Sequence, residues 1–120
     1  MEKIAVVTGT SSGIGFETAL ALARDEYYTY ATMRNTTKGH KLKELANKEN
    51  LKIDILELDV DVENSAKAAI KHVLDQKQRI DVLVNNAGWA LWGCVEDVSV
   101  DEFKAQFDTN FFSIIRLIQE

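Results

Sequence analysis

A glycine-rich stretch near the start of the chain has the residue types and the spacing to bind phosphate. It reads TGTSSGIG, from Thr8 to Gly15, and it lies between the apolar run Ile4 to Val7 and a segment with helical character. Gly9 would let the chain turn sharply off a strand, while Gly13 and Gly15 would leave out side chains that keep backbone away from a phosphate. N–H groups at the start of the following helix then face the anion. A strand, a glycine-rich turn and a helix in this order are typical of a site for a dinucleotide pyrophosphate.

Basic and hydroxyl residues indicate which dinucleotide this site would take. An NAD site carries an acid for the ribose 2′-hydroxyl roughly 20 residues after the glycines. No acidic residue occurs from Tyr27 to Lys43, and Thr32 stands near the expected place of the acid. Arg34 follows instead, and its guanidinium could bind a 2′-phosphate with hydroxyl donors from Ser11 and Ser12. We therefore expect NADP rather than NAD. The alternative is that Arg34 is only a solvent-exposed residue of a loop.

The elements that must position these residues follow an alternating pattern. Four short apolar runs are separated by segments of helical period: Ile4 to Val7, Tyr28 to Met33, Ile53 to Leu58 and Ile80 to Val84. Strands that alternate with helices predict an α/β fold with a doubly wound parallel sheet, in three layers and with strand order 3-2-1-4. The clearest helix is predicted over 61–76, with one apolar stripe. That stripe comprises Val62, Ala66, Ala69, Ile70, Val73 and Leu74.

The last helix has a clear start but no signal for its end. Ser99 can cap it with Glu102 three residues later. A predicted apolar stripe follows at Phe103, Phe107, Phe111, Ile114 and Ile118. No Gly, Asn or Pro follows Ile118, so we expect residues 1–120 to be one domain that is incomplete at its C-terminal end. The fourth strand would then be an apolar edge, which favours self-association.

Composition excludes several classes of protein. The chain has 46% hydrophobic and 28% charged residues, with a net charge of −5, which argues for a globular domain and against nucleic acid as a partner. No apolar stretch is long enough to span a membrane, and the N-terminus enters a strand at once, so we expect a cytoplasmic location. Cys94 is the single cysteine, which leaves no internal disulfide and no spacing for a metal site.

Several stretches together resemble the short-chain dehydrogenase/reductase family. They are TGTSSGIG, LDV at Leu58 to Val60, NNAG at Asn85 to Gly88, and Asn110, which lies 24 residues beyond Asn86. The resemblance implies an N-terminal cofactor-binding half with a Rossmann-like fold. The cofactor-binding residues that it implies are Gly9, Ser11, Ser12, Gly13, Ile14, Gly15, Arg34, Asp59, Val60, Asn86, Ala87 and Gly88.

The resemblance also implies particular roles. Asp59 would accept a hydrogen bond from the adenine amino group, or else serve as a helix N-terminal carboxylate. Asn86 would contact the cofactor or have a structural role, and Gly88 would let the backbone pass close to the cofactor. Asn110 matches the asparagine of the family's catalytic tetrad. Trp89, Leu91 and Trp92 would either form one wall of a substrate pocket or cover the end of the sheet.

Two functions remain open at this point. The chain is the cofactor half of an NADP-dependent oxidoreductase acting on a small-molecule alcohol or carbonyl, or it is a non-catalytic fragment that binds nucleotide and pairs with itself or a partner. The family's Ser and its Tyr-x-x-x-Lys pair are not found in these 120 residues, so we expect the chain alone to be inactive. Glu26 stands where the family usually has Gly, which would cost about 1 kcal/mol in a left-handed conformation.

Overall fold

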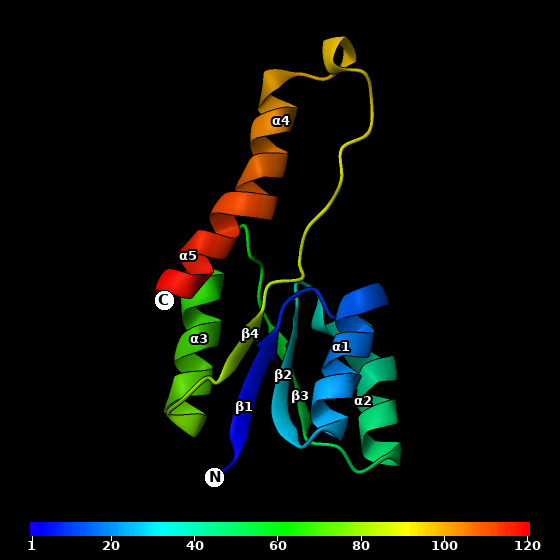
Figure 1. The fold of residues 1–120 in the computed structure, drawn as a ribbon, viewed down its shortest axis with the longest axis vertical. Coiled ribbons are helices and arrows are strands. Elements are labelled where there is room, and N and C mark those ends of the chain that lie inside the picture. Colours follow the sequence, from blue (N-terminus) through cyan, green and yellow to red (C-terminus); the bar gives the residue numbers. More distant parts are fainter.

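A parallel sheet of four strands forms the centre of the computed structural model, which describes all 120 residues (Figure 1). The strands are β1 (Lys3–Val7), β2 (Tyr27–Met33), β3 (Ile53–Glu57) and β4 (Val82–Val84). Their spatial order is β3-β2-β1-β4, and every neighbouring pair is parallel. The predicted α/β class and the strand order 3-2-1-4 are therefore confirmed.

Helices cover both faces of this sheet. The α-helices are α1 (Gly13–Arg24), α2 (His40–Lys48), α3 (Glu63–Lys77), α4 (Val100–Phe107) and α5 (Ser113–Gln119). Shorter helical turns are η1 (Thr36–Gly39), η2 (Val95–Asp97) and the π-helical turn η3 (Asp108–Phe112). In Figure 1, α1 and α2 lie on one face and α3 and α5 on the other, which confirms the three layers, while α4 extends beyond the sheet.

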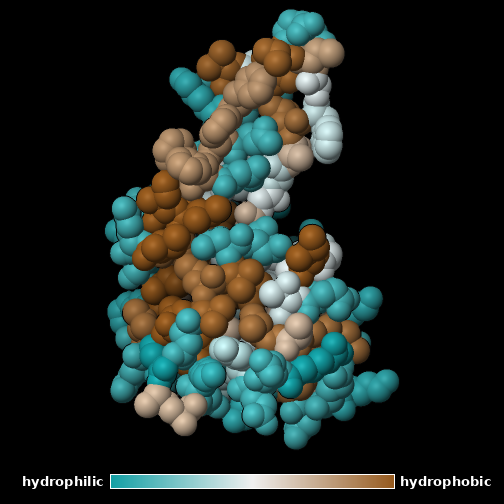
Figure 2. Space-filling model, in the orientation of Figure 1, coloured by the Kyte–Doolittle hydropathy of each residue, from teal (hydrophilic) through white to brown (hydrophobic).

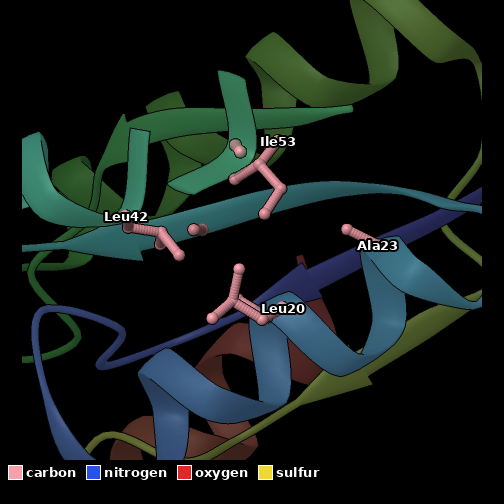
Figure 3. Close-up of a cluster of buried hydrophobic side chains, with 7 residues drawn as sticks. Leu20, Ala23, Leu42 and Ile53 are labelled. Atoms are coloured by element: carbon pink, nitrogen blue, oxygen red, sulfur yellow. The ribbon is translucent and has the colours of Figure 1, made fainter. Parts of the chain in front are cut away.

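Apolar side chains fill the space between the helices and the sheet on each face. Leu20 and Ala23 from α1 meet Leu42 from α2 and Ile53 from β3 (Figure 3). On the opposite face, α3 turns its buried side to the sheet at Ala66, Ala69, Ile70 and Val73. The predicted stripe of this helix is thus confirmed except at its ends, where Val62 and Leu74 are exposed.

The start of the last helical segment agrees with the prediction, but its buried face does not. The Ser99 side chain accepts from the Glu102 N–H at 3.1 Å, and the Ser99 N–H donates to Glu102 Oε1 at 3.2 Å, so the capping box is confirmed. The predicted apolar stripe is wrong at Phe107, Phe111 and Ile118, which are exposed, whereas its other two members, Phe103 and Ile114, are half-buried. The buried residues of the segment are Thr109, Ser113 and Leu117. Two features account for this: α4 extends past the sheet, and the wider π turn rotates the residues that follow it.

The edge strand is shorter than predicted. Pairing starts at Val82 rather than Ile80, and β4 pairs only with β1. Just before it, the Ile4 N–H donates to Asp81 Oδ2 at 2.7 Å and the Asp81 N–H donates to the Ile4 carbonyl at 2.8 Å. The Arg79 guanidinium and the Ile4 N–H lower the pKa of Asp81. A carboxylate therefore ties the start of β4 to β1.

The turn between α1 and β2 contains a residue in the left-handed region. Glu26 has φ of +69°, which is the left-handed region that favours glycine. An α-amino acid with a side chain loses about 1 kcal/mol there relative to a relaxed conformation.

Candidate functional site

A cleft of about 460 Å³ lies at the carboxyl ends of the strands. Thirteen residues line it: Gly9, Ser11, Ser12, Met33, Arg34, Leu58, Val60, Asp61, Asn86, Ala87, Gly88, Trp89 and Thr109. They come from the end of β2, from the segments that follow β1, β2, β3 and β4, and from η3. Ligands of open parallel sheets bind in a crevice of this kind, and most of the predicted cofactor residues are brought together in it.

Two glycines of the glycine-rich loop have a left-handed backbone: Gly9, which lines the cleft, and Gly13, which lines a neighbouring depression described below. Gly9 has φ of +68°, and a Cβ there would stand 2.9 Å from the Ala87 Cα. Gly13 has φ of +64° and faces open space, with no atom within 4 Å of a built Cβ. Gly9 therefore lets β1 turn beneath the loop after β4, as predicted, while the open side of Gly13 leaves room for a ligand.

Close packing gives Gly15 a reason to be glycine that the sequence did not predict. It is buried at the start of α1, and a Cβ there would stand 2.1 Å from the Gly9 carbonyl oxygen and 2.5 Å from Asn86 Nδ2. The missing side chain lets α1 pack against the loop, and a role of Gly15 in opening the backbone to a phosphate stays a prediction.

Thr8 joins the loop after β1 to the loop after β4. Its Oγ1 accepts from the backbone N–H groups of Asn86, at 3.0 Å, and Ala87, at 2.9 Å. Thr8 is 1% exposed, so these bonds lie in the interior. Thr8 was not among the predicted site residues, although its place directly after a buried strand was a usable signal.

Asn86 has the structural role that the sequence left open. Its Nδ2 donates to the Thr8 carbonyl at 3.2 Å and to the Gly9 carbonyl at 3.0 Å. It holds the glycine loop in shape and also lines the cleft. Direct contact between Asn86 and a cofactor stays a prediction.

Arg34 is exposed at the end of β2 and borders both the cleft and an adjoining recess of about 250 Å³. Ser11, Met33, Asn35 and Lys38 line the rest of this recess. The side chain of Thr32 is buried and donates to the Val7 carbonyl at 3.1 Å, so it does not face the cleft. Cationic and hydroxyl groups thus meet where the sequence predicts a 2′-phosphate.

The two aspartates after β3 lie in different places. Asp59 does not line the cleft; its Oδ1 accepts from the Asp61 N–H at 3.0 Å, and its own N–H donates to Ser65 Oγ at 2.8 Å. Asp61 does line the cleft, and its Oδ1 accepts from Thr109 Oγ1 at 2.6 Å. Asp61 and Thr109 are site residues that the sequence analysis missed, because only the fold brings them together.

Asn110 lies in the π turn and holds the backbone of the loop after β4. Its Oδ1 accepts from the Trp89 N–H at 3.0 Å, and its Nδ2 donates to the Trp89 carbonyl at 2.6 Å. A Cβ on Gly88 would stand 2.8 Å from Asn110 Oδ1, so glycine is needed there for this approach. π turns inside α-helices are often found at functional sites. Trp89 lines the cleft, whereas Trp92 is 88% exposed and does not.

A larger and more open depression of about 830 Å³ lies along the outer side of α1. It includes Gly13 and Ile14, and Lys41 stands beside it with its Nζ 5.8 Å from the centre of the Phe16 ring. We assign the site to the smaller cleft, because the strand ends and the loops that follow them converge there. Ile14 is 78% exposed and belongs to the outer depression.

No helix of the structure has both the length and the apolar composition to cross a membrane. No group of three His, Cys, Asp or Glu side chains is arranged to hold a metal ion.

The comparisons with known proteins define the class. The family model for short chain dehydrogenase matches residues 3–120, and the chain belongs to this family. An uncharacterized oxidoreductase, YusZ, from Bacillus subtilis is 44% identical over 118 residues, which cover 97% of this chain and 41% of that protein. Human retinol dehydrogenase 8 is 36% identical over 121 residues, which cover 98% of this chain and 38% of that protein. The chain thus spans about two fifths of the length of these relatives.

Solved structures agree with this assignment. A short-chain dehydrogenase from Streptomyces avermitilis superposes with a TM-score of 0.88 at 30% identity, covering 98% of this chain and 42% of that one. A metagenomic short-chain oxidoreductase in complex with NADP gives a TM-score of 0.91 at 27% identity, and the match covers 98% of this chain and 53% of that one.

Proposed function

We propose that this chain is the cofactor-binding half of an NADP-dependent oxidoreductase that moves a hydride between the nicotinamide and an alcohol or carbonyl substrate. The observation that carries the proposal is the cleft itself, which gathers the glycine loop, the Asn86 to Gly88 segment and Arg34 at one end of the sheet. The NADP named for the metagenomic relative supports the choice of cofactor.

The residues of the cleft and of the neighbouring start of α1 fit a dinucleotide phosphate. Gly13 leaves open space at the start of α1, where free backbone N–H groups favour an anion. Arg34 and Ser11 border one recess, so a guanidinium and a hydroxyl can hold a 2′-phosphate there. When bound, the nicotinamide supplies the hydride chemistry. The protein's part is to bind and orient, with Asn110 and Gly88 shaping the loop on the nicotinamide side.

Titration of the purified chain with NADPH and, separately, NADH tests this proposal. We expect saturable binding with a preference for NADPH. Arg34→Asp should weaken NADPH binding by roughly 10- to 150-fold, since a hydrogen bond to a charged group contributes about 1.5 to 3 kcal/mol. Lys48→Asp, on the exposed end of α2, is the matched charge control and should leave the preference unchanged. An Arg34→Asp variant with the wild-type cofactor preference would refute the role of Arg34.

Catalysis by these 120 residues alone is not expected. They contain no Tyr-x-x-x-Lys sequence, whose tyrosine would act as the general acid or base in the family. A panel of carbonyl substrates with NADPH should therefore show no turnover, and measurable turnover would contradict this part of the proposal. A cytoplasmic location likewise stays a prediction.

The alternative function is a non-catalytic nucleotide-binding fragment that pairs with itself. One observation favours self-association: large apolar side chains of the last helical segment are exposed, and Figure 2 shows apolar surface along it. These residues are Val100, Phe107, Phe111, Phe112, Ile115 and Ile118. Sedimentation of the wild type and of Phe107→Glu tests this idea, because a charge on that face should shift a dimer toward monomer. A wild type that stays monomeric at high micromolar concentration would argue against it.

A further inference from the structure

The hydroxyl of Thr109 connects the π turn to the segment that follows β3. Its bond of 2.6 Å to the Asp61 carboxylate joins two residues that are 48 positions apart, and both line the cleft. Thr109 is 6% exposed and is the one residue from the segment 100–119 that lines the cleft. We propose that Thr109 and Asp61 are a positioning pair, whose hydrogen bond fixes the π turn and thereby the place where Asn110 holds the Trp89 backbone.

The π turn does not need Asp61 for its own hydrogen bonds. The Ser113 N–H donates to the Asp108 carbonyl five residues earlier, and the Ser113 hydroxyl donates to the Thr109 carbonyl. Arg116 spans the turn with two bonds to the Asp108 carboxylate, at 2.9 and 3.1 Å, and lowers the pKa of Asp108. The bond between Thr109 and Asp61 therefore docks a turn that is already formed.

Apolar packing holds the segment only on the C-terminal side of the turn. Leu117 of α5 is buried in a cluster with Leu58 and with Ala66, Ala69 and Ile70 of α3. On the other side, α4 has no buried residue and extends beyond the sheet (Figure 1). Loss of the Thr109 hydroxyl should therefore leave α5 in place and free the turn and α4 to move.

Such movement would reach the cleft through Asn110. Both bonds of the Asn110 side chain go to the backbone of Trp89, which lines the cleft and is 41% exposed. The effect on cofactor affinity rests on the proposed function. The effect on Trp89 does not, because it is a property of the protein without ligand.

Trp89 can report on this pair directly. The chain has two tryptophans, so Trp92→Phe leaves Trp89 as the only one. In that background and without cofactor, we expect Thr109→Val and Asp61→Ala to raise the acrylamide quenching of Trp89 and its fast anisotropy decay. Thr109→Ser keeps the hydroxyl and should behave as the parent. NADPH should bind the first two variants about fivefold or more weakly, with the Ser variant near the parent.

Thr29→Val is the matched control for the loss of a buried hydroxyl. The Thr29 hydroxyl donates to the Tyr27 carbonyl at 3.1 Å within β2, away from the cleft. Thr29→Val should lower the melting temperature without changing the acrylamide quenching or the anisotropy decay of Trp89. Unchanged Trp89 quenching in folded Asp61→Ala, whose substituted residue is exposed, would overturn the proposed positioning pair. Changed quenching without NADPH binding to any protein, the parent included, would support the pair and refute the proposed cofactor.

Discussion

Gly15→Ala tests whether the glycine loop and α1 pack as tightly as the structure shows. A methyl group at this position would stand 2.1 Å from the Gly9 carbonyl oxygen and 2.9 Å from its carbon. An ordinary contact is longer than 3.4 Å, so either the loop or the start of α1 must move by more than 1 Å. Overpacking of this kind costs about 1 to 3 kcal/mol, and occasionally more; because the contact is with backbone, we expect about 3 kcal/mol.

Gly13→Ala is the matched control, two residues earlier in the same loop. A methyl group there meets nothing within 4 Å, and only the φ of +64° opposes it. The expected cost is about 1 kcal/mol. For a domain of this size, the two variants should lower the melting temperature by about 12 and about 4 °C.

Thermal and urea unfolding of the wild type, Gly15→Ala and Gly13→Ala measure this difference in stability. NADPH titration below the melting temperatures shows whether the cleft changes as well. Gly15→Ala should weaken cofactor binding as well, because Gly9 and Asn86 both line the cleft. If Gly15→Ala loses no more stability than Gly13→Ala, the close packing of the loop on α1 is wrong.

Three further changes test other parts of the structure. Glu26→Gly should raise the melting temperature by about 3 °C, because glycine relieves the left-handed φ; no gain would mean that the turn is relaxed. Thr8→Val leaves the N–H groups of Asn86 and Ala87 without their acceptor and should cost about 2 to 4 kcal/mol in urea unfolding, whereas Thr8→Ser should recover most of it. The folded-state pKa of Asp81 is lowered, so its contribution to stability is present at neutral pH and lost as pH falls below about 4. The melting temperature of Asp81→Asn should therefore fall less than that of the wild type between pH 5 and pH 2, and parallel curves would contradict this.

The order of strands and helices could be predicted from the sequence because the signals are local. The apolar runs predicted the strands at Ile4 to Val7 and Tyr28 to Met33 to within a residue. Alternation with helices then allowed few topologies, and the right-handed crossover rule favours the observed one. The capping box at Ser99 was also readable, because both of its partners lie within four residues.

The buried face of the last helix could not be predicted in the same way. The prediction from the apolar pattern assumed that the whole segment has an α-helical period and that another element packs on its apolar side. Phe107 has no such neighbour, and the π turn changes the period just where Thr109 becomes buried. Patterns in a sequence show which face is apolar but not whether anything covers it.

The sequence by itself determined the family, the strand–turn–helix unit around Gly9 and Gly13, and the place of Arg34 after the second strand, since each depends on residues close together in the chain. The tertiary structure decided which aspartate reaches the cleft and what holds the π turn. It placed Asp61 rather than Asp59 in the cleft wall, and it brought Thr109 to Asp61 across 48 residues. Hydrogen bonds between segments that are far apart in the chain depend on how the helices pack on the sheet. No local sequence pattern encodes that packing.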